Sequence, residues 1–322
     1  LRGAALIHSR VRLGALVALG GLLLVALTAT PAGAAIVAAS SSAAGHGLSI
    51  GQAIVLGIVE GVTEFLPISS TGHLLVTARV LDIGRHGAAE DAIKSYEIAI
   101  QAGAILAVLG LYRHRFAAMV EGVVGRSEPG RRVLIAVVIA FIPAALVGVV
   151  LEQEIKDRLF GPWPVVAAWA VGGVLILVFS RNGVLAPRGG LHVEDITVRH
   201  ALVIGAAQVL SLWPGTSRSL VTIVAGLLIG LSMTAAVEFS FLLGFVTLSA
   251  ATGYQILKDG QAMIDAFGIA APLVGLVSAF VAAVIAIRWM VHYLERHDLS
   301  IFGWYRLGVA ALVAVLVVTG SI

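Results

Sequence analysis

Several residue types are scarce or missing in this sequence, and the absences narrow its chemistry. There is no cysteine among the 322 residues, and the only lysines are Lys94, Lys156 and Lys258. The lack of cysteine excludes disulfides, thiolate nucleophiles and cysteine-ligated zinc or iron-sulfur centres. Any metal ion must therefore be bound by oxygen or imidazole ligands.

Charge is also scarce, at 12% of the residues, while hydrophobic residues make up 59% and the mean hydropathy is +1.01. Ordinary soluble domains contain about 45 to 50% apolar residues. Repeated apolar runs long enough to cross a bilayer predict an integral membrane protein. The net charge of +3 comes from arginines between these runs, a pattern that reports membrane orientation. We expect no nucleic-acid partner.

Residues 1–45 form an N-terminal extension that is distinct from the rest of the chain. Three arginines (Arg2, Arg10 and Arg12) precede an apolar run, and Ala32-Gly33-Ala34 follows it. This order is typical of a secretory signal peptide, although a retained first transmembrane helix fits it as well. Both alternatives place the basic end in the cytoplasm. Residues 46–322 are expected to form a single membrane-embedded domain.

The first part of that domain contains a broken helix. Ser49 is suited to cap a helix over about 50–65, which Pro67 ends because proline cannot continue it. Ser70 or Thr71 is expected to cap a second short apolar helix. Two short helices joined at such a turn predict a re-entrant hairpin with its tip near the membrane midplane.

A second broken element follows at about 200–230, with a break at Pro214-Gly215 and Ser217 as the expected cap of its second helix. Full-length spans are predicted at about 92–112, 133–151, 163–180, 234–252, 269–287 and 303–320. The fold class is therefore an all-α polytopic membrane protein with an inverted repeat. Each unit is a re-entrant helical hairpin followed by three transmembrane helices, with repeat 1 at about 48–182 and repeat 2 at about 198–322.

Arginine and lysine positions predict the orientation of this arrangement. Ten basic residues fall on the side assigned to the cytoplasm: Arg113, Arg115, Arg126, Arg131, Arg132, Arg181, Arg188, Arg199, Arg288 and Arg296. Five fall on the other side: Arg85, Lys94, Lys156, Arg158 and Lys258. The positive-inside rule then has the first hairpin enter from outside and the second from the cytoplasm.

Glu60 and Glu64 are the most unusual residues of the first hairpin. They lie four positions apart on one face of an apolar helix, so their charges repel each other. An ionisable group in a membrane costs at least about 2.5 to 3.5 kcal/mol. A shared proton, an arginine or a divalent cation could neutralise the pair. Two carboxylates suit Mg²⁺ or Ca²⁺, with water and phosphate oxygens as further ligands.

Hydroxyl and basic groups are expected to join this pair if the two hairpin tips meet. Arg218 follows a Pro-Gly break at a helix start, where free amides and the arginine fork favour a phosphoryl group. Ser70 and His73 are a candidate nucleophile and base, and the sequence does not decide which of them attacks. The other candidate phosphate-binding residues are Ser69, Thr71, Ser217, Ser219 and Thr222.

Each of these residues also has a simpler interpretation. The hydroxyl residues of the first turn could serve only as helix caps, and Arg218 could be a structural partner of an acidic residue. Four further polar residues are interpreted as interhelical supports or as groups behind the site: Glu97, Gln101, Gln208 and Glu238.

Two motifs, EGVTEFLPISSTGH and PGTSRS, together with YEIAIQAGAILAV and VEFSFLL, resemble the bacterial undecaprenyl-diphosphatase family, also called the bacitracin-resistance protein family. The resemblance covers about residues 48–320. It implies an enzyme of the bacterial inner membrane that hydrolyses undecaprenyl diphosphate to undecaprenyl phosphate and phosphate. This reaction recycles the carrier lipid for peptidoglycan synthesis.

By position, the resemblance places Glu60 and Glu64 on the family's acidic pair and Ser70 and His73 on its nucleophile or base positions. Arg218, with Ser217 and Thr222, falls on its phosphate-binding motif. The resemblance also implies a required divalent cation and a site that opens to the extracytoplasmic side. A homodimer is an open alternative for the assembly. This sequence departs from the family at Leu220, where a glycine is common, and after Leu243, where a proline is common.

Another class of protein also fits the pattern. Inverted repeats with broken helices are typical of transporters, so an isoprenoid-phosphate transporter or flippase is the alternative function. A lipid phosphatase of the acid-phosphatase superfamily fits less well, because that family has a lysine-rich first motif and this chain has three lysines.

Overall fold

The computed structural model describes residues 48–81, 83, 88–186 and 189–320, and in these residues the chain is all-α apart from an isolated parallel bridge between Leu191 and Leu231. The predicted N-terminal extension lies outside the described residues. The α-helices in chain order are α3 (Ile50–Thr63), α4 (Ser70–Val80), α5 (Ala88–Leu111), α6 (Arg113–Val123), α7 (Glu128–Leu159), α8 (Pro162–Arg181), α9 (Val198–Gln208), α10 (Arg218–Leu228), α11 (Met233–Phe267), α12 (Ala270–Leu294) and α13 (Ser300–Val318). Short 3-10 helices η1 (Val193–Asp195) and η2 (Val209–Leu212) precede and follow α9.

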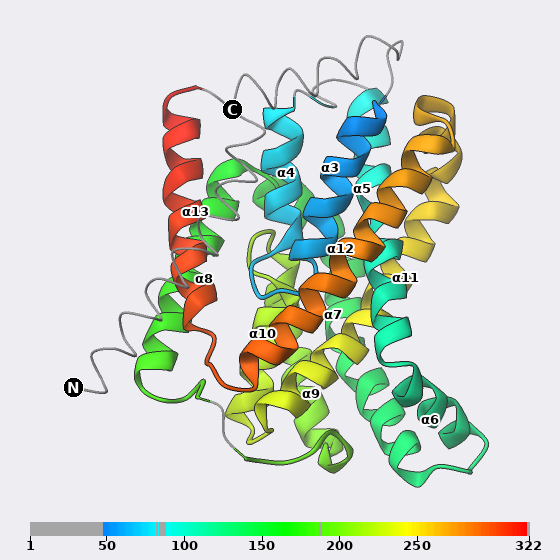
Figure 1. Cartoon of the computed structure of the whole chain (residues 1–322), viewed down its shortest axis with the longest axis vertical. Coiled ribbons are helices and arrows are strands. Elements are labelled where there is room, and N and C mark those ends of the chain that lie inside the picture. The colour runs from blue at the N-terminus through cyan, green and yellow to red at the C-terminus, as the bar shows by residue number, and fades with distance from the viewer. Residues whose placement is uncertain (1–47, 82, 84–87, 187–188, 321–322) are drawn as a thin grey trace.

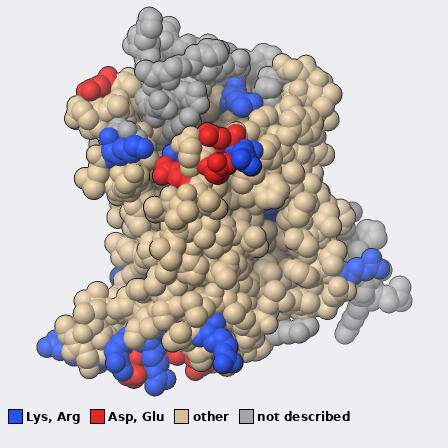
Figure 2. Space-filling model, turned by 180° about the vertical axis from the view of Figure 1, so that it is seen from behind, with Lys and Arg blue, Asp and Glu red and all other residues tan. Residues whose placement is uncertain are grey.

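Five helices of the described chain are long and apolar enough to cross a membrane: α7, α8, α11, α12 and α13. Ser95–Leu111 of α5 and the whole of α6 pass the same test only when taken together, and this pair, bent by 79°, is a sixth candidate span. Figure 2 shows most charged side chains of one face gathered towards the two ends of the molecule, with a belt between them that carries few charged side chains. A multi-pass membrane protein is the fold that this surface requires.

The two broken elements form hairpins that enter from opposite ends. In Figure 1, α3 and α4 descend from one end, while α9 and α10 rise from the other, and the turns of both lie near the middle of the molecule. Each hairpin is followed by three spans, α5, α7 and α8 in the first unit and α11, α12 and α13 in the second. This order and geometry are consistent with the predicted inverted repeat.

One expected helix cap is wrong. The sequence favoured Ser70 or Thr71 as the cap of the second helix, but α4 begins at Ser70 and its N-cap is Ser69, whose side chain makes no capping bond. The Ser70 hydroxyl is instead bonded to Glu64. Ser217 caps α10 as predicted, because its hydroxyl accepts a hydrogen bond from the Leu220 N–H at 3.3 Å.

Two spans are longer than the hydrophobic runs alone indicate. The run at 133–151 lies within α7, whose 32 residues end in the exposed i, i+4 ion pairs Glu152–Lys156 and Glu154–Arg158. The run at 234–252 lies within the 35-residue α11. Hydropathy locates the membrane-embedded part of a helix, whereas polar i, i+4 pairs let the same helix continue into water.

Small residues let α3 lie directly against α12. A Cβ on Gly57 would strike the Gly275 backbone, and one on Gly61 would strike the backbone at Ala279. The Gly57-x-x-x-Gly61 spacing is therefore a packing feature, as small-residue spacings between membrane helices generally are. This contact fixes the face of α3 that carries Glu60 within the helix bundle.

Candidate functional site

The turns of the two hairpins touch each other at the centre of the described structure. The Leu66 carbonyl, in the turn after α3, accepts hydrogen bonds from the hydroxyls of Ser219 at 2.9 Å and Ser217 at 3.4 Å. The hydroxyls of Ser217 and Ser219, which the sequence predicts to bind phosphate, therefore donate to a backbone carbonyl of the broken helix in this structure. The sequence expectation that the hairpin tips meet is confirmed by these contacts.

Glu64 joins the two hairpins through its side chain. Its Oε1 lies 3.1 Å from Nη2 of Arg218, and its Oε2 accepts the hydroxyl hydrogen of Ser70. Both members of the ion pair are nearly buried, with 9% of the Arg218 side chain and 6% of the Glu64 side chain exposed. The Arg218 guanidinium also donates to the Ser240 carbonyl at 3.1 Å and lies 5.2 Å from the centre of the Phe65 ring. A serine, a carboxylate and an arginine thus form one connected group.

Space for the Arg218 guanidinium comes from Gly244 on α11. A Cβ at Gly244 would overlap the guanidinium, so even alanine there would displace it. This glycine lies in the segment after Leu243 that departs from the resembled family.

Glu60 is fully buried, and neither carboxylate oxygen has a hydrogen-bond partner within the described residues. The negative charges of Glu64 and Glu97 act on it, whereas the positive charge of Arg218 opposes them. An unpaired buried carboxylate is costly, so it must carry a proton or bind a cation. The side chain is suited to either role.

A metal ion would find two carboxylate ligands here. Across the described residues, no group of three or more His, Asp or Glu side chains is placed to hold a metal. Mg²⁺ and Ca²⁺ nevertheless fit the oxygen chemistry of Glu60 and Glu64, because both ions readily take water and phosphate oxygens as further ligands. The orphaned oxygens of Glu60 are the feature that favours such an ion.

His73 is held away from Ser70. Its Nδ1 lies 2.6 Å from the Ser69 carbonyl oxygen and its Nε2 lies 2.8 Å from the Tyr305 hydroxyl. Because a carbonyl only accepts, Nδ1 carries the hydrogen and Nε2 accepts one from Tyr305. The edge of Trp169 packs against the ring at 5.0 Å between centroids. The structure thus does not bring His73 and Ser70 together as a hydrogen-bonded base and nucleophile.

Each of the four backbone carbonyls at residues 66–69, in the first turn, accepts a hydrogen bond from a side chain. The Leu66 carbonyl accepts hydrogen bonds from Ser219 on α10 and from Ser217, the N-cap of α10. The Ser69 carbonyl accepts one from the His73 ring. Between them, the Pro67 carbonyl accepts from Arg306 at 3.3 Å and the Ile68 carbonyl from the Trp169 indole at 2.8 Å. A broken backbone inside a membrane requires such partners.

Arg306 on α13 connects the two turns a second time. It is fully buried, and besides Pro67 it donates to the carbonyls of Gly215 and Ala168, both at 2.8 Å. These three bonds go to carbonyls rather than to a carboxylate. Its guanidinium sits over Gly172 on α8, where any Cβ would clash.

Sequence reasoning missed Trp169, Tyr305 and Arg306. A signal was present for Arg306, because an ionisable residue inside an apolar span is a functional candidate by default, and Arg306 lies in the span predicted at 303–320. The two aromatic residues carried no such signal, since tryptophan and tyrosine are common in membrane helices.

Both turns also share an uncommon backbone conformation. Ser69 has φ 72° and ψ 107°, and Ser217 has φ 76° and ψ 114°; within the described chain they are the non-glycine residues with positive φ. Such a conformation costs of order 1 to 3 kcal/mol and persists only where the surroundings enforce it. Equivalent positions in the two hairpins thus carry the same strain.

The remaining predicted phosphate-binding residues differ in position. Thr222 is buried, and its hydroxyl lies 2.7 Å from that of Ser240 and donates to the Arg218 carbonyl at 2.8 Å. Thr71, in the first turn of α4, is partly exposed beside the buried Ser70. Thr222 therefore supports the helix that carries Arg218, while Thr71 is the more accessible hydroxyl.

The polar residues interpreted as supports lie at helix contacts. Gln101 on α5 accepts from Thr252 at 3.5 Å, and the buried Gln208 accepts from Thr247 at 3.4 Å. Glu238 on α11 is bonded to Arg115, which also pairs with Glu194. Glu97 differs from these three, because its charge acts on Glu60.

Comparison with known proteins places the chain in a family. The family model described as bacitracin resistance protein BacA matches residues 53–312. A protein of Sorangium cellulosum (strain So ce56) named undecaprenyl-diphosphatase is 48% identical over 264 residues, covering 81% of this chain and 84% of the relative. Proteins of the same name from Janthinobacterium sp. (strain Marseille) and Nitrosomonas europaea are 44% and 43% identical, over 80% and 84% of this chain and 91% and 96% of their own lengths. The chain therefore belongs to the bacitracin resistance protein BacA family.

Proposed function

We propose that this protein is an undecaprenyl-diphosphate phosphatase, which hydrolyses undecaprenyl diphosphate to undecaprenyl phosphate and inorganic phosphate and so confers bacitracin resistance. Family membership and the name shared by its relatives support this function. The structural observation that carries it is the connected group of Ser70, Glu64 and Arg218 where the hairpin turns meet. That group combines a nucleophile, a base and a phosphate-binding cation.

Glu64 is the base that the geometry favours for Ser70. As the Ser70 oxygen bonds to the terminal phosphorus, its proton passes to Glu64, with which it is already hydrogen-bonded. The bond from that phosphorus to the bridging oxygen breaks, and undecaprenyl phosphate leaves. Water then hydrolyses the phosphoserine, releasing phosphate and restoring the Ser70 hydroxyl.

Arg218 stabilises the charge that develops on the transferred group. A fork of N–H donors matches phosphate oxygens, and its value is greatest in a site that excludes water. A divalent cation, Mg²⁺ or Ca²⁺, would be held by Glu60 and Glu64 and would supply further positive charge for the phosphoryl oxygens. His73 is assigned to hold the Ser69 carbonyl and thereby the start of α4.

The protein resides in the bacterial cell membrane, with a site proposed to open to the extracytoplasmic side. The ten-to-five distribution of basic residues supports this orientation.

Purified protein in detergent, supplied with undecaprenyl diphosphate, tests the proposal by phosphate release. Ser70→Ala and Glu64→Gln should each lower kcat by about a hundredfold or more, because each removes a partner of the proton transfer. Acid-quenched reactions with substrate labelled in the terminal phosphate should contain phosphoserine at Ser70. Lipid translocation in vesicles without phosphate release would instead establish the transporter alternative.

A further inference from the structure

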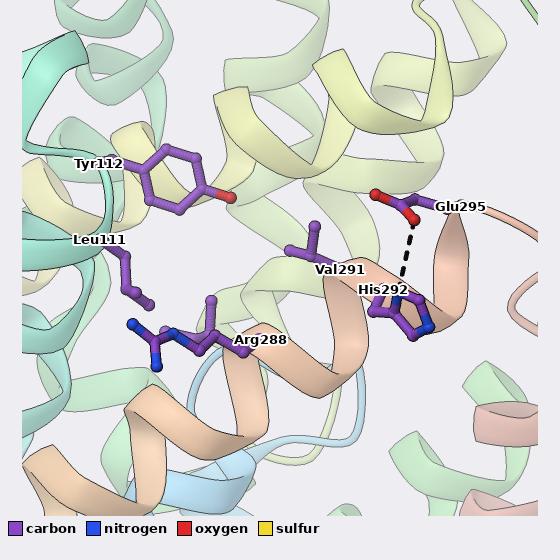
Figure 3. A pocket seen from close by; sticks show the side chains of 7 residues that line it. Leu111, Tyr112, Arg288, Val291, His292 and Glu295 are labelled. Carbon is purple, nitrogen blue, oxygen red and sulfur yellow. Dashed lines mark ion pairs between the residues drawn. The ribbon is translucent and has the colours of Figure 1, made fainter.

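A cavity lies away from the proposed catalytic site, between the end of α5 and the end of α12. Its volume is about 340 Å³, and it is lined by Leu111, Tyr112, Ile287, Arg288, Val291, His292 and Glu295 (Figure 3). The arginine distribution assigns this end of the molecule to the cytoplasm. None of the lining residues takes part in the proposed reaction.

Two groups in this cavity have hydrogen-bonding capacity to spare. Among the described residues, the exposed Arg288 guanidinium has no carboxylate partner, and the Tyr112 hydroxyl makes no hydrogen bond. In Figure 3, Arg288 extends from α12 towards Leu111, and Tyr112 projects from the α5 side. The Tyr112 ring is anchored edge-on against Phe241, with 5.8 Å between centroids.

The one acidic residue that lines the cavity is already engaged. Glu295 lies 3.5 Å from His292, and within the described residues no ion pair joins it to Arg288. The cavity therefore combines a free cation with a free phenol donor. An anion is the complementary ligand.

The position of the cavity places it at the membrane surface. At Tyr112 the chain turns by 79° between α5 and α6, and the exposed Arg113 and His114 follow directly. A sharp bend followed by charged and polar residues is expected where a span reaches the membrane surface. On α12, Trp289 and Tyr293 stack at 5.5 Å, and such aromatic residues are enriched at the level of lipid head groups. The walls formed by Leu111, Ile287 and Val291 are apolar.

We propose that this cavity binds an anionic phospholipid of the cytoplasmic leaflet. Arg288 contacts the phosphate and the Tyr112 hydroxyl contacts another oxygen of the lipid, while Leu111, Ile287 and Val291 contact the first part of an acyl chain. A soluble anion would leave these apolar walls unused, whereas a lipid matches both the cation and the walls. Arginine near an anionic leaflet is attracted to it even without a shaped site, so the cavity is what adds selectivity.

Native mass spectrometry can test this with protein from nanodiscs of phosphatidylcholine containing phosphatidylglycerol. The wild type should retain phosphatidylglycerol in preference to phosphatidylcholine. Arg288→Ala should reduce that retention by about tenfold or more, because it removes a charge-assisted hydrogen bond to the phosphate in addition to the general attraction that any surface arginine has for anionic lipid. Arg199→Ala is the matched control, because Arg199 is an exposed arginine at the same end of the molecule and does not line the cavity.

Equal retention by the wild type and Arg288→Ala would overturn the proposal, as would an equal loss in Arg199→Ala. Displacement of the lipid by inorganic phosphate at matched concentration would also overturn it, because the site would then be one for a soluble anion. Tyr112→Phe should lower retention with the ring packing preserved. Phosphate release from detergent-solubilised substrate should be unchanged in Arg288→Ala, so failure here is distinct from failure of the proposed enzyme function.

Discussion

The Arg218 guanidinium lies 3.1 Å from the Glu64 carboxylate, although the two residues are 154 positions apart in the chain. The pair joins the start of one hairpin's second helix to the end of the other hairpin's first helix. Glu64 holds Ser70 with its second oxygen. Movement of one hairpin relative to the other would therefore separate Ser70, the proposed nucleophile, from the Arg218 guanidinium.

Arg218→Lys tests whether this arginine binds phosphate. Lysine keeps the charge but lacks the planar fork, so it cannot contact Glu64 and the Ser240 carbonyl while also presenting aligned donors to a phosphoryl group. A charge-assisted hydrogen bond is worth about 1.5 to 3 kcal/mol, so kcat/KM should fall by about ten- to a hundredfold or more. The measurement is steady-state phosphate release.

Arg199→Lys is the matched control for that experiment, because Arg199 is exposed on α9. Near wild-type kinetics in Arg218→Lys would return Arg218 to a purely structural role. Gly244→Ala offers an independent check: it keeps the arginine but displaces its guanidinium, so activity should fall in the same direction.

Glu60→Gln and Glu64→Gln test the acidic pair. Each variant removes one carboxylate charge from a buried pair, so each should lose most activity and respond more weakly to added Mg²⁺ or chelator. Glu64→Gln should be the more severe, because Glu64 also contacts Ser70 and Arg218. Full activity in both, with an unchanged metal response, would refute the proposed cation site.

Arg306 is predicted to act as a positioning residue for both turns. Arg306→Ala leaves the carbonyls of Pro67, Gly215 and Ala168 without this donor, so the thermal unfolding midpoint in detergent should fall markedly. Arg306→Lys should restore part of the loss. The exposed Arg296→Ala should leave the midpoint unchanged.

If Arg306→Ala fails to fold, Gly172→Ala keeps the prediction testable. The added methyl group would overlap the guanidinium and push it off the turns. We expect a folded protein with reduced kcat and little change in KM, because the loss is one of geometry rather than of substrate contact. Wild-type kcat in this variant would assign Arg306 to stability alone.

Membrane orientation can be measured directly, because the native chain has no cysteine to give a background signal. A membrane-impermeant thiol reagent should label Glu154→Cys from outside the cell, since Glu154 is exposed at the far end of α7. Arg126→Cys, between α6 and α7, should be labelled only after the membrane is opened. The reverse pattern would invert the proposed topology and the side to which the site opens.

Sequence reasoning found the hairpins and spans because each has a strong local cause. Pro67 and Pro214 stop helices wherever they occur, and long apolar runs have few alternatives to crossing a membrane. A pairing of Arg218 with an acidic residue is one of the alternatives that the sequence offers, because a buried carboxylate needs a counter-charge, but the sequence does not select Glu64. The bend at Tyr112 and the polar extensions of α7 and α11 were missed, since neither feature depends on hydropathy.

The internal bonds of the site were harder to predict. His73 is three positions from Ser70, and helical spacing alone makes the two neighbours. Its actual partners are the Ser69 carbonyl and Tyr305, which is 232 residues away. The preference for Glu64 as the base follows from the turn geometry around Ser69, and that geometry depends on donors from distant helices.

The hydrogen bonds of the first turn determine when the first hairpin can reach its final structure during synthesis. The turn at residues 66–69 is synthesised early, but the donors to three of its carbonyls come from Trp169, from the serines of α10 and from Arg306. Chains are built from the N-terminus, so this hairpin enters the membrane before most of its partners exist. The first hairpin therefore reaches its final bonding only when α13 has inserted, and until then water or the insertion machinery must solvate its carbonyls.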